Sequence, residues 1–218
     1  MKESFLILVL RVLILFTGLT IAHLGVSLFL IAALGADPFN VFIQGLLRLE
    51  EQYLSLDFIT HGRIHMIISF LIILVLLVTD KSYIRSGTLI CMFCGGPIID
   101  CFNSVLMPVL NPFLTLPFRI FINIAGCAVL AYGMTIVIKS EAGTGPNDLV
   151  ALVISEKSKI KFAPVRIIVD ILFAATGFWL GGTLGLGTVI CAFVVGPVAG
   201  VFLPYNEKLI KRIISKIK

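Results

Sequence analysis

The chain has 218 residues, of which 59% are hydrophobic and 13% charged, and its formal net charge is +5 at pH 7. Soluble domains are about 45–50% apolar and about 25% charged, so this composition excludes an ordinary soluble fold and indicates an integral membrane protein. The positive charge does not indicate a nucleic-acid partner, because the basic residues cluster between hydrophobic runs and at the C-terminus, where an anionic lipid leaflet attracts them.

Six hydrophobic stretches are long enough to cross a membrane, since a spanning helix needs roughly 20 mainly apolar residues. In chain order they predict spans at about 5–34, 61–79, 86–109, 116–139, 164–182 and 185–205. Two shorter apolar segments, 38–48 and 146–156, each begin with a glycine-rich turn and a proline, which favours the start of a helix. We expect these two to be short helices that lie at the membrane interface or enter it partway.

The C-terminal residues 206–218 place leucine and isoleucine on one side of a helix and basic residues largely on the other, which predicts an amphipathic helix on the membrane surface. Basic residues in short loops set the orientation of the spans. With a cytoplasmic N-terminus, the outside loops hold only Arg48 and Arg63, whereas the inside loops hold Lys2, Lys81, Arg85, Lys139, Lys157, Lys159 and Lys161. We therefore expect a multi-pass protein with both termini in the cytoplasm.

The two halves of the chain, about 5–109 and 116–205, repeat each other. At an offset of 108, the first half matches the second at Gly18 and Gly126, Gly25 and Gly133, Gly35 and Gly143, and Pro38 and Pro146; at an offset of 100, the matches include Cys91 and Cys191, and Pro97 and Pro197. Each copy holds three spans, an odd number, so the second copy enters the membrane from the opposite side. The predicted fold is an all-α single membrane domain of residues 1–218, with six transmembrane helices in two inverted three-helix repeats.

Inverted repeats are typical of secondary transporters, whose two halves exchange inward-open and outward-open forms. We therefore predict a small-molecule secondary transporter or permease that works by alternating access. Two alternatives stay open: a substrate-binding membrane subunit of a transporter driven by a separate ATPase, and a non-transporting scaffold or regulatory factor. The sequence has no phosphate-binding loop, zinc-protease motif or serine-hydrolase motif, so we expect no enzymatic activity and no cofactor. A homo-oligomer stays open as an assembly of the protein.

The sequences Gly-Ala-Asp-Pro-Phe-Asn at 35–40 and Gly-Thr-Gly-Pro-Asn-Asp at 143–148 follow the first span of each half. This duplicated motif resembles the YczE/YyaS/YitT family of bacterial membrane proteins, and it is most similar to the YczE-like branch. The resemblance covers essentially the whole chain. It implies an integral protein of the bacterial cytoplasmic membrane, and it implies no particular substrate.

The two Gly-Pro turns are the first candidate binding site, because a helix N-terminus offers free N–H groups and a partial positive charge. Their asparagine and aspartate side chains either bind a polar ligand or simply cap the following helix, as Asn40 or Asp148 would. The candidate residues are Gly35, Asp37, Pro38, Asn40, Gly143, Gly145, Pro146, Asn147 and Asp148.

A second candidate site is the pair Gly96-Pro97 and Gly196-Pro197. A proline inside a helix removes a backbone hydrogen bond and kinks the helix. The freed carbonyl groups either line a cavity for substrate or reflect a structural kink beside which glycine allows close packing.

Ionisable residues inside the spans are the third candidate, because charges in the membrane usually face the bundle interior and pair. Asp100, Asp170 and His23 are candidates for binding a coupling ion. The alternative for either aspartate is an ion pair with Arg11, Arg119 or Arg166. The five cysteines lie in apolar runs, which disfavours redox chemistry at Cys91-x-x-Cys94, and four-ligand metal spacing is absent.

Overall fold

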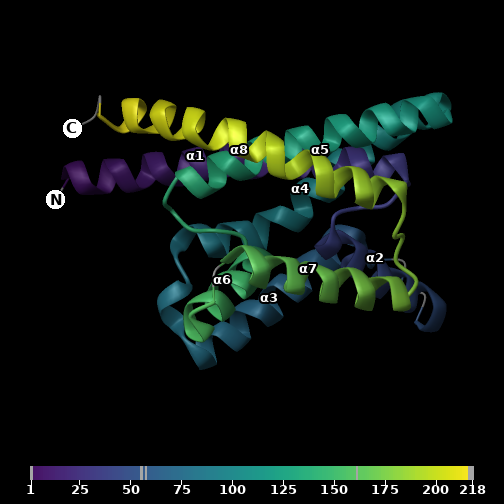
Figure 1. Ribbon diagram of the computed structural model, residues 1–218, viewed down its shortest axis with the longest axis horizontal. Helices are drawn as coiled ribbons and strands as arrows, with labels where there is room; N and C mark the ends of the chain where they lie inside the picture. Colours follow the sequence, from purple (N-terminus) through teal and green to yellow (C-terminus); the bar gives the residue numbers. More distant parts are fainter. Residues whose placement is uncertain (1, 55, 57, 161, 216–218) are drawn as a thin grey trace.

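The protein is helical throughout the residues that the computed structural model describes, which are 2–54, 56, 58–160 and 162–215. Within these residues eight α-helices follow one another (Figure 1): α1 (Lys2–Ala32), α2 (Pro38–Tyr53), α3 (His61–Thr79), α4 (Ser86–Leu110), α5 (Leu116–Lys139), α6 (Pro146–Ser158), α7 (Phe162–Trp179) and α8 (Leu186–Ser215). Single 3-10 turns precede α4 and α5. The predicted all-α class is confirmed.

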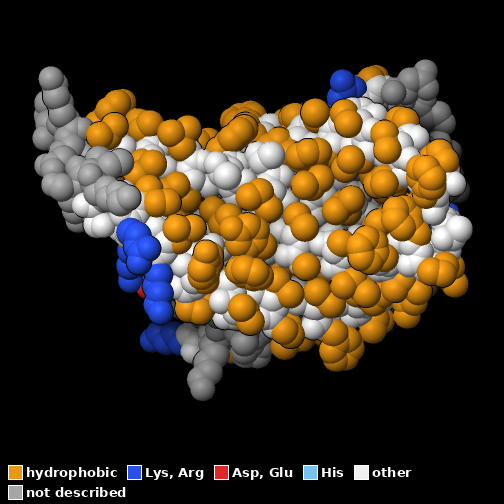
Figure 2. All heavy atoms as spheres, turned by 90° about the horizontal axis from the view of Figure 1, so that it is seen from above, with side chains coloured by type: hydrophobic (Ala, Val, Ile, Leu, Met, Phe, Trp, Pro, Cys, Tyr) orange, Lys and Arg blue, Asp and Glu red, His pale blue; other side chains and the backbone are white. Residues whose placement is uncertain are grey.

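Membrane-spanning length is reached by five stretches of the described chain. These are Phe5–Ala32, His61–Thr79, Ser86–Phe113, Leu116–Lys139 and Leu186–Ser215. The face seen in Figure 2 is covered largely by hydrophobic side chains, and the Lys and Arg side chains visible there lie towards its two ends. A surface of this kind fits lipid as the solvent. Five of the six expected spans are thus confirmed, whereas the sixth, 164–182, corresponds to the 18-residue helix α7 and stays a prediction.

Helices α1 and α5 cross at four glycines and run in opposite directions (Figure 1). A methyl group on Gly25 would lie 2.5 Å from the carbonyl oxygen of Gly126, and one on Gly133 would lie 2.6 Å from that of Gly18. Only glycine allows two backbones to approach so closely. The four residues are the repeat-related positions, so the Gly18–Gly133 contact is the repeat equivalent of the Gly126–Gly25 contact.

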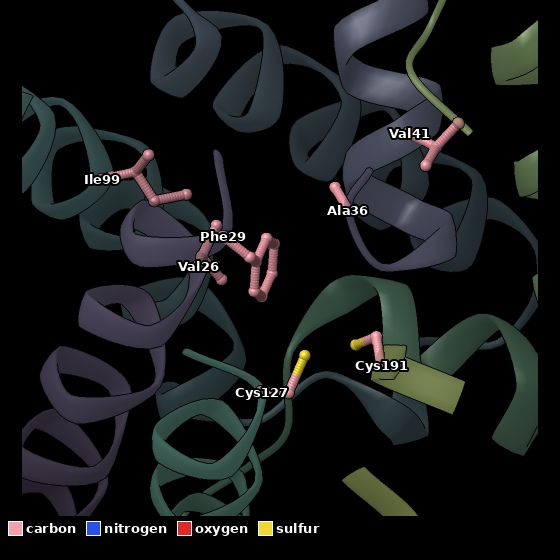
Figure 3. Close-up of a cluster of buried hydrophobic side chains, with 7 residues drawn as sticks. All are labelled: Val26, Phe29, Ala36, Val41, Ile99, Cys127 and Cys191. Atoms are coloured by element: carbon pink, nitrogen blue, oxygen red, sulfur yellow. The ribbon is translucent and has the colours of Figure 1, made fainter. Parts of the chain in front are cut away.

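The remaining helices pack around this central pair. Helix α4 packs on α1 and α8 packs on α5, whereas α2 packs on α7 and α6 packs on both α3 and α7. A buried apolar cluster joins α1, α2, α4, α5 and α8 (Figure 3), and it consists of Val26, Phe29, Ala36, Val41, Ile99, Cys127 and Cys191. The two sulfur atoms point into the same space as the ring of Phe29, and all five cysteines of the chain are free thiols.

Helix boundaries differ from expectation at three places. Helix α1 ends at Ala32 rather than at 34, because Ala33 takes a left-handed φ of 52°. Helices α2 and α6 extend beyond the expected 48 and 156, to Tyr53 and Ser158. Lys161 and residues 216–218, to which we assigned roles in topology and in the surface tail, lie outside the described residues.

The last span (185–205) and the tail (206–218) were expected as two elements, and a break between them is wrong for the described residues, whereas the position of the tail at the membrane surface stays a prediction. Helix α8 continues without interruption through Pro204 to Ser215. The buried Asn206 side chain donates a hydrogen bond to the Thr135 hydroxyl at 2.7 Å, and Glu207 accepts one from Lys139 at 2.6 Å. These contacts hold the end of α8 against α5, which is why it continues along the bundle.

Candidate functional site

The first Gly-Pro turn is built by Gly35 and capped by Asp37. Gly35 has a φ of +116°, which favours glycine, and the Leu34 carbonyl accepts a hydrogen bond from the Gly187 amide at 2.7 Å. The Asp37 carboxylate caps α2 by accepting from the Asn40 amide N–H at 3.3 Å, and it also accepts from the Asn40 side chain at 2.6 Å. The turn therefore docks on the start of α8 while Asp37 orients Asn40.

The second Gly-Pro turn repeats this docking on the opposite half. Gly143 has a φ of +149°, and the carbonyl of Ala142 accepts a hydrogen bond from the Gly87 amide at 3.0 Å. A methyl group on Gly143 would lie 2.7 Å from the Thr88 amide nitrogen. This turn docks on the start of α4, so each half of the chain supplies the partner of the other half's turn.

In the first half, the oriented Asn40 reaches a group of buried histidines. Its amide oxygen lies 2.8 Å from His61 Nε2. His23 lies edge-on to His65 with ring centroids 5.6 Å apart, and its Nδ1 bonds the Leu19 carbonyl at 2.8 Å. All three histidines are less than 10% exposed. Of the three histidines, only His23 was predicted from the sequence as a candidate site residue. The spacing of His61 and His65 within an apolar span would also have indicated these two.

Two neighbouring polar groups on α3 have no hydrogen-bond partner in the structure, and sequence reasoning missed them as well. They are His65 Nδ1 and Ser69 Oγ, one helical turn apart, and both residues are buried. Gly95 makes room beside them, because a methyl group there would lie 2.9 Å from His23 Nε2 and 3.2 Å from His65 Cε1. Unpaired polar groups inside a bundle are costly, which makes this part of α3 a candidate functional site.

The histidine group is not arranged as a metal centre. Among the residues that the structure describes, no three histidine, cysteine, aspartate or glutamate side chains are placed to hold a metal ion.

In the second half, the equivalent position carries an ion triad. Arg166 donates to Asp148 at 2.5 Å and to Asp170 at 2.9 Å, and the three side chains are between 25% and 29% exposed. Asp170 thus takes the predicted ion-pair role. The capping interpretation is wrong for both Asn40 and Asp148: α2 is capped by Asp37, and α6 begins at Gly145 without a side-chain cap. Asn147 donates to Asp148 at 3.3 Å.

Asp37 lies between α1 and α2, outside the spanning helices, and is half-buried. Burial raises the pKa of its carboxyl, and the two hydrogen bonds from Asn40 oppose that shift. The charges of Asp170 and Arg166 also act on Asp37, in opposite directions, although these two residues form their ion pairs with each other and with Asp148. The candidate site therefore consists of two groups of polar side chains, one beside each Gly-Pro turn, which together we call the polar chain.

Asp100 does not belong to this chain. Its carboxylate accepts from the Gly62 amide at 2.9 Å and from the Thr60 hydroxyl at 2.5 Å, at the start of α3. The ion-pair interpretation is therefore wrong for Asp100, which binds a helix N-terminus instead of an arginine. Of the three arginines we considered, Arg166 pairs with Asp148 and Asp170, Arg11 pairs with Glu141 at 2.7 Å, and Arg119 Nε donates to the Leu114 carbonyl at 3.1 Å.

The two Gly-Pro pairs inside α4 and α8 lie apart from the polar chain. Pro97 and Pro197 both occupy exposed positions inside continuous helices. Gly96 is buried against Gly62, whereas a methyl group on Gly196 would meet no atom within 4 Å. Pro97 borders a pocket with Gly62, Arg63, Met66 and Asp100. Both interpretations of these Gly-Pro pairs, a cavity lining and a structural kink, stay predictions.

Comparison with known proteins identifies the family. A family described as "Family of unknown function (DUF6198)" matches residues 9–204. The chain belongs to this family. It is 32% identical over 212 residues to the "Uncharacterized membrane protein YczE" of Bacillus subtilis (strain 168), covering 96% of this chain and 93% of the relative. The predicted resemblance to YczE and YyaS is thereby confirmed, and the YczE name together with the apolar helices supports a membrane location.

Two further relatives cover most of the DUF6198 domain. An "Uncharacterized protein" of Haemophilus influenzae is 28% identical over 196 residues, which are 90% of this chain and 84% of the relative. The "Uncharacterized protein YyaS" of Bacillus subtilis is 27% identical over 194 residues, which are 88% and 91% of the two chains. No solved structure matches the chain.

Proposed function

We propose that this DUF6198 protein is a secondary transporter of the bacterial cytoplasmic membrane, built from two inverted three-helix repeats that provide six spans, with both termini in the cytoplasm. The observation that carries the proposal is the polar chain inside the bundle. It comprises Asp37, Asn40 and the histidines beside the first Gly-Pro turn and the Arg166 triad beside the second. Ionisable groups at such positions in membrane proteins usually serve a substrate or an ion.

Reciprocal contacts support the inverted repeat. The Leu34–Gly187 hydrogen bond and the Ala142–Gly87 hydrogen bond relate positions at the offsets of 108 and 100. The close contacts between α1 and α5 show the same symmetry, because the Gly18–Gly133 contact and the Gly126–Gly25 contact are equivalent in the repeat. Contacts of this kind arise when two copies of one design face each other about a twofold axis in the membrane plane, the arrangement found in many secondary transporters.

The charges of the polar chain favour a cation as the transported species. Asp37, Asp148 and Asp170 provide three carboxylates, whereas Arg166 provides a single guanidinium, which pairs with Asp148 and Asp170. An excess of negative charge inside a membrane is costly unless it is neutralised. A proton or a small protonated amine would supply the missing positive charge. Transport in this proposal involves no chemical conversion of the substrate.

Flux measurements on the purified protein test the proposal. Proteoliposomes with an internal pH dye are given a panel of small amines, after a thermal-shift screen has selected those that stabilise the native state. We expect saturable amine-dependent flux that Arg166→Met abolishes and Arg63→Met, at an exposed arginine, preserves. Flux that appears only with a co-purified ATPase would favour the transporter-subunit alternative. Absence of both binding and flux would favour the scaffold alternative and refute the proposal.

A further inference from the structure

The α3–α4 interface of the first half has no equivalent in the second half, in the part of the chain that the structure describes. Helix α3 packs tightly on α4, where a methyl group on Gly62 would lie 2.2 Å from the Gly96 carbonyl oxygen and one on Gly96 would lie 2.0 Å from the Gly62 carbonyl oxygen. The Asp100 carboxylate binds the α3 N-terminus at the same place. The repeat equivalents of α3 and α4 are α7 and α8, and no comparable packing joins those two helices in the described residues.

The face of α8 that corresponds to this interface is bare. Gly196 and Gly200 occupy the positions of Gly96 and Asp100, and a methyl group on either would meet no atom within 4 Å. Glycine inside a helix destabilises it relative to alanine. Two glycines one turn apart on an uncovered face therefore imply that a backbone approaches them in another arrangement, as small residues permit in membrane bundles.

The corresponding face of α7 is also uncovered. At an offset of 101, Arg166 and Asp170 on α7 occupy the positions of His65 and Ser69 on α3. The α3 residues are buried, whereas the α7 residues are half-buried. The same offset relates Leu76, which packs with Val153, to Gly177, which packs with Gly45. The ion triad is therefore accessible from the side that α8 would cover.

We infer that the α3–α4 and α7–α8 interfaces are the two gates of an alternating carrier. In the structure the α3–α4 gate is closed and the α7–α8 gate is open. In the second state α7 packs on Gly196 and Gly200, while α3 separates from Gly96. This inference rests on the proposed inverted repeat. With the proposed orientation, the α3 N-terminus is on the outer side and the α7 N-terminus on the inner side, so the structure is an inward-open state.

Matched pairs of spin labels test the inference without any substrate. One pair is placed at Met66 and Cys101 across the closed gate, and the repeat-equivalent pair is placed at Ile167 and Val201 across the open gate. The labels are introduced as cysteines in a background whose other native cysteines are replaced by alanine, after its melting temperature has been matched to that of the native chain. Distances are measured by pulsed electron–electron double resonance in nanodiscs.

We expect two distance populations for each pair, with the 66–101 distance long when the 167–201 distance is short. Gly96→Ala, whose methyl group clashes in the closed gate, should enrich the second state. Gly196→Leu, whose side chain meets nothing in the present state, should remove the short 167–201 population and leave the melting temperature unchanged. This second variant keeps the test decisive if Gly96→Ala fails to fold.

A single long 167–201 distance in the native chain and in Gly96→Ala would overturn the inference and leave lipid as the occupant of the α8 face. A short distance that also appears with the single label at Ile167 would overturn it in favour of a second copy of the chain. Distances that exchange without any amine flux would uphold the gates and refute transport, so the two failures are distinguishable.

Discussion

The Arg166 triad offers the sharpest test of how the interior is stabilised. Replacing Arg166 with methionine keeps an unbranched apolar stem and removes the guanidinium that binds Asp148 at 2.5 Å and Asp170 at 2.9 Å. Two carboxylates then face each other in a half-buried site. Leaving such groups without their partner costs about 1–3 kcal/mol. For a chain of this length about 2–4 °C of melting temperature corresponds to each kcal/mol, so we expect a loss of about 2–12 °C.

The controls separate charge from packing. Arg63→Met removes an exposed arginine whose aromatic partner, Phe58, lies 5.9 Å away, and such a contact is worth about 0.5–1 kcal/mol. Adding Asp148→Asn and Asp170→Asn to Arg166→Met removes the uncompensated charges, and we expect this triple variant to recover most of the lost stability. Melting is followed by fluorescence in detergent. Equal melting temperatures for Arg166→Met and Arg63→Met would refute the reasoning.

Three further predictions concern single positions. Because burial raises the pKa of Asp37, the native state keeps this proton above pH 3.8 where the unfolded chain loses it; melting temperature should therefore fall as pH rises through that range, and Asp37→Asn, which still caps α2, should flatten the slope. Gly25→Ala should cost about 1–3 kcal/mol by overpacking the α1–α5 crossing, whereas Gly200→Ala, where the methyl group meets no atom, should stabilise the protein by about 0.5–1 kcal/mol. Asp100→Ala should lower the free energy of unfolding by about 0.5–2 kcal/mol, because the N-terminus of α3 loses the carboxylate that accepts from its Gly62 amide. An unchanged melting temperature would show that water replaces the carboxylate.

Much of the fold could be predicted because its physical signals are local. Spans at 61–79 and 116–139 follow from apolar length alone and agree with α3 and α5. The Gly-Pro turns follow from residues that favour a positive φ and a helix start. The break expected at 205 was wrong, because the Asn206–Thr135 and Lys139–Glu207 contacts that extend α8 are tertiary.

The candidate site could be predicted only in part, because the contacts that assemble it are also tertiary. Its members were visible as polar residues in apolar runs, and Asp170 with Arg166 follows from their spacing of four on one helix. The partners of Asn40 and Asp100 are on α3, which a single sequence does not place relative to α2 or α4. His61 and Gly62 therefore escaped notice until the helices were packed.

The reciprocal docking of the two Gly-Pro turns has a consequence for biosynthesis. The turn at Leu34 obtains its backbone partner from Gly187, near the end of the chain, and the turn at Ala142 obtains its partner from Gly87. The turn at Leu34 therefore lacks this hydrogen bond until α8 has been synthesised and inserted. Truncation of the chain before α8 would leave the Leu34 carbonyl group without this partner, which is costly in a membrane, where no water replaces the lost hydrogen bond.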